Sequence, residues 1–201
     1  FCQLEKVNEE RRGRSVFAWA EDQINTVPIG SDGIIYHPYI NSTGVISPFF
    51  NPAARAQFFG ISIEHTKKQM LRAVYEGTAL AIHDCYSQMP VEIDQVYISG
   101  GGARSSTWSQ MIADATGKSI LVSKGDELGA KGVAILAGIA SGLYPSLKEA
   151  VNRSIHVERE FTPNPKAHSQ FNKVYDVYRK IYKDVNESWW ARYAMLQKLR
   201  K

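Results

Sequence analysis

Three consecutive glycines, Gly100, Gly101 and Gly102, stand between a short apolar run and a helical pattern in ISGGGARSSTWSQMIAD, residues 98–114. A strand that turns straight into a helix directs the free N–H groups of the first helical turn, and the positive end of the helix dipole, at the turn. Phosphate binds at such ends, and glycines let it approach the backbone while permitting positive φ. The run predicts a phosphate or nucleotide site, with a strand-to-helix turn that binds nothing as the alternative.

Two named nucleotide-binding motifs account poorly for this run. A complete Walker A loop, GxxxxGK[ST], does not occur in the sequence. A dinucleotide fingerprint requires GxGxxG, whereas Gly100, Gly102 and Ser105 give GxGxxS. The phosphate interpretation therefore depends on the junction itself, and a dinucleotide-dependent oxidoreductase domain stays open as an alternative.

A second glycine-rich junction follows in KGDELGAKGVAILAG, residues 124–138, where Glu127, Gly129 and Gly132 stand at the start of a helical pattern. Small residues at that place let a helix end approach a flat ligand or another helix closely. Two glycine-rich helix starts in consecutive units can face one nucleotide from opposite sides.

Other polar residues have simpler structural interpretations. Asp32 in GSDG favours a turn in which the carboxylate bonds its own backbone. Asp114 favours a local cap or pair, and Arg55 favours pairing that holds its loop. Arg72 and Glu76, four residues apart, favour an ordinary helix pair. The histidines without metal-ligand spacing are His37, His65 and His83.

Periodic apolar residues place these groups on alternating helices and strands. Helices are predicted at residues 15–24, from Glu64 to before Pro90, from Ser105 or Ser106 to Thr116 with Gly117 ending it, at 127–142, near Ser146, and as one long helix within 163–201. Strands are predicted at 34–40, 93–100 and 119–123. The alternation predicts a single α/β domain over residues 1–201.

Residues 41–60 show neither a helical nor a strand period, so we expect a long irregular loop there. The loop carries Phe49, Phe50, Phe58 and Phe59, which no regular element can bury together. Exposed aromatic patches usually mark interaction surfaces, so we expect this loop to meet another part of a larger protein. The alternative is that the rings pack beneath their own loop.

Composition limits the class of protein. Of 201 residues, 44% are hydrophobic and 22% charged, which suffices for a packed core without disulfides or metals. Only Cys2 and Cys85 are present, which suits a reducing cytosol, and no apolar run approaches the roughly 20 residues of a membrane helix. The net charge of +4 includes a basic end, KLRK, which we interpret as a solvated helix end. We therefore expect a cytoplasmic protein with neither nucleic-acid nor membrane partners.

Several long motifs occur in a characteristic order. They are GIIYHPYI, NPAARAQFFGIS, HTKKQMLRAVYEGTALAI, ISGGGARSSTWSQMIADATGKSI and ELGAKGVAILAGIASGLY, between Gly33 and Tyr144. In this order they resemble the C-terminal half of the FGGY carbohydrate kinases, which include xylulokinase and glycerol kinase. The fourth is similar to that family's adenosine-binding segment, and the fifth to the glycine- and alanine-rich helix after it.

The resemblance implies a ribonuclease-H-like lobe of the actin, hexokinase and heat-shock ATPase type, with a mixed sheet flanked by helices. ATP would lie in the cleft between this lobe and an N-terminal lobe, and Mg²⁺ would accompany it. Gly101, Gly102 and Ala103 would lie against the phosphates, and Ser105 or Ser106 would approach the adenine. The far wall would be lined by Glu127 and Gly129.

In this family the general base, a second phosphate loop and most sugar contacts precede the segment that begins here with Phe1. We therefore assign no catalytic residue, expect a fragment that is inactive alone, and name the N-terminal lobe as its partner. The substrate would be a sugar or polyol that the sequence does not specify, and a homodimer stays open. A non-catalytic ATPase-fold interaction module is the remaining alternative.

Overall fold

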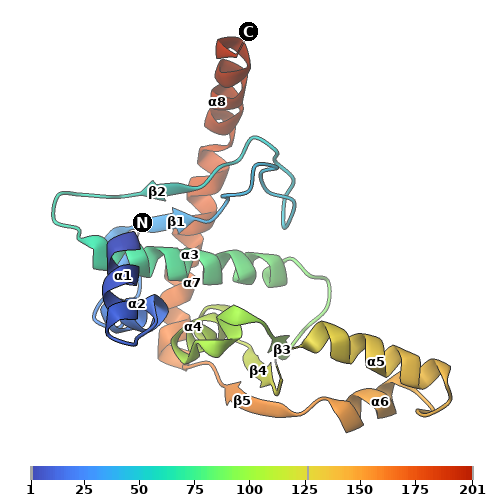
Figure 1. Cartoon of the computed structure of the whole chain (residues 1–201). Coiled ribbons are helices and arrows are strands. Elements are labelled where there is room, and N and C mark those ends of the chain that lie inside the picture. The colour runs from blue at the N-terminus through green and yellow to red at the C-terminus, as the bar shows by residue number, and fades with distance from the viewer. Residues whose placement is uncertain (1, 126, 201) are drawn as a thin grey trace.

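The computed structural model describes residues 2–125 and 127–200. It opens with α1 (Gln3–Arg11), α2 (Val16–Ile24), the short 3₁₀ turn η1 (Ser31–Gly33), β1 (Ile35–His37) and β2 (Gln57–Phe59) (Figure 1). The central part holds α3 (Lys67–Ser87), β3 (Gln95–Ile98), the 3₁₀ turn η2 (Gly101–Arg104), α4 (Ser106–Thr116) and β4 (Ser119–Ser123). The last elements are α5 (Leu128–Ala140), α6 (Leu147–Ser154), β5 (Val157–Phe161), α7 (Pro165–Asp184) and α8 (Asn186–Leu199). The predicted α/β class is confirmed.

Side-chain caps set the starts of the helices. The predicted helix at Glu64 begins instead at Lys67, because the Thr66 hydroxyl accepts from the Lys68 amide while the Gln69 side chain accepts from the Thr66 amide. α4 is capped by Ser105 rather than Ser106, since the Ser105 hydroxyl accepts from the Trp108 amide at 2.9 Å.

The strands form two small sheets. β3 and β4 pair in parallel and β4 pairs antiparallel with β5, so β4 is the central strand of a mixed sheet. β1 and β2 form a separate antiparallel pair in which Tyr36 lies opposite Phe58. The segment predicted as wholly irregular, residues 41–60, therefore contains a strand, which forms because β1 supplies its partner.

α3 lies across β1 at unusually close range. A Cβ added to Gly77 would come well within 3.0 Å of the Tyr36 carbonyl oxygen, so only glycine allows this approach. α7 packs against α3, α4 and β1 and buries Phe171, Tyr178 and Ile181 in the same core. The Arg-Ala-x-x-Glu-Gly pattern of α3 therefore specifies packing of a helix against a strand.

The C-terminal segment is two helices instead of the one long helix predicted within 163–201. Val185 separates α7 from α8 with φ −88° and ψ 3°, outside helical geometry. The apolar spacing through Ile181, Val185 and Trp189 continues across this break, which is why periodicity did not reveal it. Beyond Trp189, α8 extends away from the body (Figure 1).

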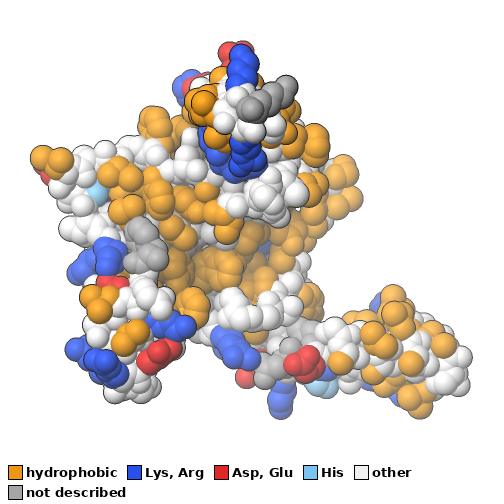
Figure 2. Space-filling view, turned by 45° about the horizontal axis from the view of Figure 1, so that its top comes forward, with side chains coloured by type: hydrophobic (Ala, Val, Ile, Leu, Met, Phe, Trp, Pro, Cys, Tyr) orange, Lys and Arg blue, Asp and Glu red, His pale blue; other side chains and the backbone are white. Residues whose placement is uncertain are grey.

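α5 and α6 form a projecting arm that packs mainly on itself (Figure 1). Figure 2 shows hydrophobic side chains on this arm and others gathered in the hollowed middle of the same face. Val133 and Leu136 on α5 and Leu147 on α6 are each more than half exposed. Across the described residues, no helix combines the length and apolar character needed to cross a membrane.

Candidate functional site

A cavity of about 930 Å³ opens between α2, α3 and the turn that leads into α4. Its lining comes from three separate stretches of sequence. These are Ser15, Phe17, Ala18 and Glu21 near α2, Val74, Tyr75 and Thr78 on α3, and Gly101, Gly102, Arg104, Ser105 and Trp108 at the glycine turn and α4. The junction predicted from its three glycines therefore forms part of the wall of this cavity.

Each of the three glycines in the turn has a different structural environment. Of the three, only Gly100 has a positive φ, +81°, so only this position needs the backbone freedom that glycine provides. A Cβ on Gly101 would meet nothing within 4 Å. A Cβ on Gly102 would come well within 3.0 Å of the six-membered ring of Trp108. Gly102 therefore makes room for an indole ring, which corrects the expectation that all three glycines permit positive φ.

Backbone N–H groups are available at the start of the turn. The first hydrogen bond of η2 runs from the Ala103 amide to the Gly100 carbonyl at 3.1 Å, so the Gly101 and Gly102 amides precede it. Ser105 then caps α4 and also lines the cavity. This end of the cavity offers backbone donors at two helix starts, the arrangement that favours an anion.

The part of the lining that comes from α2 and α3 is largely aromatic and apolar. Phe17 is 70% exposed at its rim, and Tyr75 and Val74 from α3 stand beside it. Burial, reinforced by the nearby Glu21 carboxylate, raises the pKa of the Tyr75 hydroxyl above its ordinary value, so Tyr75 is a neutral donor at pH 7. Among the described residues of the lining, Glu21 supplies the carboxylate. Such a surface suits a flat ring with hydroxyl groups at its edge.

The other predicted site residues lie elsewhere. Ala103 is buried, and its carbonyl and the Ser106 hydroxyl both accept from Arg159 behind the turn. Glu127 and Gly129 are exposed at the start of α5 and do not line the cavity, because the chain after β4 leads into the projecting arm. The structure thus brings together Gly101, Gly102 and Ser105 and separates the second glycine-rich junction from them.

Sequence reasoning missed the contributions from α2 and α3. Phe17, Glu21 and Tyr75 lie more than twenty residues upstream of the glycines, and each looks like an ordinary surface or core residue in its own helix. The sequence of α2 did contain a usable signal for this wall. Ser15 is the N-cap of α2, and Phe17, in the first turn after it, is an exposed aromatic residue.

A buried ion pair supports the α3 wall. Arg72 Nε donates to Glu76 at 2.7 Å, and both side chains are almost fully buried. Glu76 also accepts from the Gly30 amide and the Ser31 hydroxyl, which fastens the preceding turn to α3. Burial raises the pKa of the Glu76 carboxyl, while Arg72 opposes that shift. The predicted pair is confirmed, but as a buried cluster rather than a surface one.

The simpler interpretations of other residues agree with the contacts in most respects. Asp32 lies in a turn as predicted, in η1 with φ +53°, but its carboxylate accepts from the Gln69 side chain instead of its own backbone. Arg55 donates to the carbonyls of Pro52, Ala54 and Ser42 and so holds its loop. Asp114 accepts from Gln110 and from the Asn164 amide.

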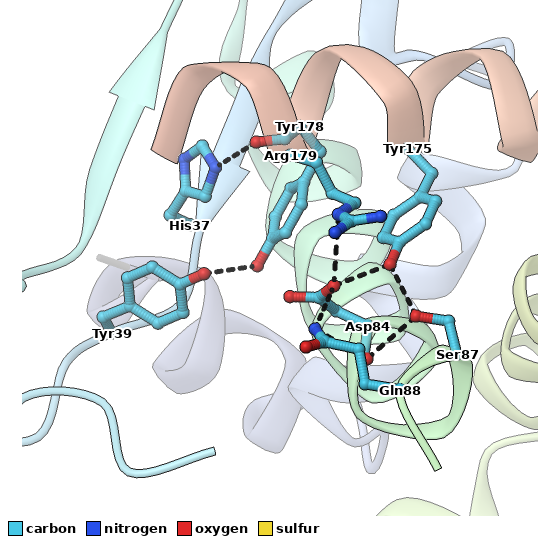
Figure 3. Close-up of polar contacts among 8 residues, drawn as sticks. All are labelled: His37, Tyr39, Asp84, Ser87, Gln88, Tyr175, Tyr178 and Arg179. Carbon is cyan, nitrogen blue, oxygen red and sulfur yellow. Dashed lines mark hydrogen bonds and ion pairs between the residues drawn. The ribbon is translucent and has the colours of Figure 1, made fainter. Parts of the chain in front are cut away.

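A second polar cluster joins α3 to α7 (Figure 3). Asp84 is 1% exposed and accepts hydrogen bonds from the Tyr175 hydroxyl at 2.6 Å and from Gln88. It also forms an ion pair with Arg179 at 3.7 Å. Beside it, His37 Nε2 donates to the Tyr178 carbonyl at 3.0 Å, and the hydroxyls of Tyr39 and Tyr178 pair at 3.2 Å. No spacing in the sequence marks Asp84 as part of this cluster, because its partners on α7, Tyr175 and Arg179, lie more than ninety residues away.

The described residues form an α/β lobe, and its likeness to solved sugar-kinase structures assigns it to the ribonuclease-H-like type. The chain belongs to the FGGY family of carbohydrate kinases, because residues 5–141 match the C-terminal domain of that family. This confirms the resemblance and removes support from the oxidoreductase alternative.

Individual relatives agree. The chain is 30% identical over 169 residues to a xylulose kinase from Bacillus subtilis (strain 168), covering 81% of this chain and 34% of that protein. It is 30% identical over 201 residues to an autoinducer-2 kinase from Enterobacter sp. (strain 638), covering 96% and 35%. The crystal structure of ligand-bound xylulose kinase from Lactobacillus acidophilus matches with a TM-score of 0.79 and 26% identity, covering 89% of this chain and 36% of that one. This chain therefore spans about a third of the length of these relatives.

Proposed function

We propose that this chain is the nucleotide-binding half of an ATP-dependent sugar or polyol kinase. The observation that carries the proposal is the cavity in which helix-start amides at the glycine turn face an aromatic wall on α2 and α3. Membership of the carbohydrate kinase family supports ATP as the nucleotide. In the complete enzyme, the terminal phosphate would pass to a carbohydrate hydroxyl held mainly by an N-terminal lobe.

Each end of the cavity has a chemical task in this proposal. The Gly101 and Gly102 amides would donate to phosphate oxygens, and the positive ends of η2 and α4 would stabilise their charge. Phe17 and Tyr75 would flank the adenine, and the Glu21 carboxylate would accept from ribose hydroxyls. Phosphoryl transfer depends on such positioning and charge stabilisation more than on covalent chemistry.

Mg²⁺ fits this site only through the nucleotide. Among residues 2–125 and 127–200, no group of three or more histidine, cysteine or acidic side chains could hold a metal ion. Mg²⁺ commonly binds substrate phosphates and water with one or two carboxylates, and Glu21 is the carboxylate at this cavity. The ion would neutralise phosphate charge, while the chain's own residues position the nucleotide.

The partner and the compartment complete the proposal. The relatives are named for different substrates, so the proposal extends to a sugar or polyol and no further. The N-terminal lobe of the same kinase is the proposed partner. Free Cys2 and Cys85 suit the reducing cytoplasm, where we place the enzyme.

Isothermal titration of the purified chain with ATP, ADP, adenosine and NAD tests the proposal. We expect ATP and ADP to bind, NAD to bind more weakly, and no phosphorylation of pentoses or polyols by the chain alone. Binding of NAD in preference to ATP would contradict the proposal and favour the oxidoreductase alternative. ATP binding by a complete protein that phosphorylates no carbohydrate would favour a non-catalytic interaction module.

A further inference from the structure

Arg159 on β5 reaches the glycine turn from the side away from the cavity. Its Nη2 donates to the Ala103 carbonyl at 2.6 Å, and its Nη1 donates to the Ser106 hydroxyl at 3.0 Å. A longer contact of 3.4 Å joins Nη1 to the Arg104 carbonyl. One guanidinium therefore contacts three consecutive parts of the connection between η2 and α4.

The strand fixes Arg159 in this position. β5 pairs with the central strand β4, where Arg159 lies opposite Val122. Its guanidinium carbon lies 5.7 Å from the centre of the Phe161 ring, a cation–π contact that restricts the side chain further. Arg159 is half-buried and does not line the cavity. It is therefore placed to act on the turn and not on a ligand directly.

The contacts of Arg159 hold the peptide groups at the end of η2, which are bonded in turn to the glycines before them: the Ser105 amide donates to the Gly102 carbonyl at 3.1 Å. The Ala103 carbonyl belongs to the peptide whose N–H is that of Arg104, and the Arg104 carbonyl to the peptide whose N–H is that of Ser105. A cation at these carbonyls polarises both peptides and holds their planes, since charge-assisted hydrogen bonds are the strong ones. It also keeps a permanent positive charge behind a site proposed for phosphate.

We infer that Arg159 is a positioning residue for the phosphate end of the nucleotide site. It holds the end of the glycine turn through Ala103 and Ser106, and the Ser105 amide of that segment bonds the Gly102 carbonyl, so the Gly101 and Gly102 amides keep the orientation proposed for phosphate. The inference rests on the proposed function and adds a residue from a strand outside the cavity lining. It also gives Ala103 and Ser106 a role as the attachment points of Arg159.

Titration of the wild-type chain and of Arg159→Met with ATP and with adenosine tests this inference. We expect the ATP dissociation constant to rise about tenfold in Arg159→Met, as for the loss of a strong charge-assisted contact, while that of adenosine stays unchanged. Arg159→Lys keeps the charge but cannot contact the same acceptors in parallel, so we expect a smaller rise. Arg153→Met, which removes an exposed pair with Glu149 on α6, is the matched control and should bind as wild type.

The outcomes separate the two proposals. If the wild-type chain binds no ATP, the proposed function fails and this inference fails with it. If the wild type binds ATP and Arg159→Met binds it equally well, only the inference is overturned. Equal weakening of ATP and adenosine would also overturn it, because that result indicates general damage to the fold. If Arg159→Met does not fold, the same comparison is decided on Arg159→Lys.

Discussion

The ring of Trp108 occupies the space that a side chain on Gly102 would need. The contact joins the glycine turn to the first turn of α4, where the Trp108 amide is itself bound by Ser105. The turn and the helix are thus held together by a ring on one side and a cap on the other. The shape of the proposed phosphate site therefore depends on a packing contact as well as on glycine.

Alanine at the two neighbouring glycines should separate packing from binding. Gly102→Ala would force Trp108 to move, so we expect a loss of about 1–3 kcal/mol in the free energy of unfolding together with weaker ATP binding. Gly101→Ala meets no neighbour, so stability should hold while its methyl group enters the cavity and weakens ATP binding. Urea unfolding and titration of both variants give the comparison, and equal stability of the two would contradict the Trp108 contact.

Gly77 should tolerate no side chain. A Cβ on Gly77 would overlap the Tyr36 backbone. We therefore expect Gly77→Ala to lower the free energy of unfolding by about 3 kcal/mol, the top of the range usual for overpacking. Gly132→Ala on α5 is the control, since nothing lies within 4 Å of the added carbon and alanine favours a helix by about 1 kcal/mol. Thermal unfolding should show opposite shifts of the midpoint in the two variants.

Removing Glu76 should cost far more than removing an exposed pair partner. Glu76→Ala leaves Arg72 buried without its carboxylate, and such losses cost about 3–5 kcal/mol. It also releases the Gly30 amide and the Ser31 hydroxyl. Glu149→Ala removes the carboxylate of a largely exposed pair with Arg153 and should change stability by less than about 1 kcal/mol. Similar urea midpoints for the two variants would refute the buried cluster.

Acid should destabilise the fold between pH 6.5 and about 4. Burial lowers the pKa of His37 from 6.5 to about 4, and burial likewise lowers that of His83 to about 4. The unfolded chain therefore binds protons that the folded chain does not, so this stability is complete above pH 6.5 and is lost as the pH falls. Each histidine contributes a slope of up to about 1.4 kcal/mol per pH unit.

Replacing His37 tests that assignment. His37→Gln removes one of the two titrating rings, so the dependence of the free energy of unfolding on pH should fall by about half in that window. Unfolding in urea at several pH values measures the slope independently of any uniform loss of stability. An unchanged slope would show that His37 does not titrate in this range.

The aromatic loop gives a prediction about association. Phe49 stacks on Tyr182 and Phe58 lies against Tyr36, whereas Phe50 is 75% and Phe59 53% exposed. Two of the four rings thus pack within the chain, and two stay candidates for the predicted interface. We expect Phe50→Ser to reduce hydrophobic-dye binding and self-association without a loss of stability. Phe49→Ser is the contrasting variant and should lower the unfolding midpoint.

Local signals in the sequence predicted much of the fold. α2 spans nearly the whole of the helix predicted at residues 15–24. Ser105 and Gly117 cap the two ends of α4, and such caps are predictable because capping depends only on neighbours in the chain. β2 was not predicted because three residues become a strand only when β1 lies alongside. The break at Val185 was not predicted because the apolar spacing continues through it.

The candidate site was predictable on one side only. The glycine turn is a continuous stretch with a local signal, so Gly101, Gly102 and Ser105 were predicted as site residues, and all three line the cavity. The aromatic wall is created by the packing of α2 against α3, which no pattern within either helix specifies. Distant contacts also account for Arg159 and Asp84, whose partners lie about 50 and 90 residues away in the sequence.

The packing of α5 and α6 mainly on each other has a consequence for local unfolding of the protein. A backbone amide exchanges with deuterium through the opening reaction of lowest free energy that breaks its hydrogen bond. Segments with few buried apolar contacts open as separate cooperative units. Among the described side chains of α5, Ile135 is the one buried hydrophobic residue, whereas α3, α4 and α7 share a common core. The arm can therefore unfold and refold as a unit while the cavity walls on α3 and α4 keep their protection.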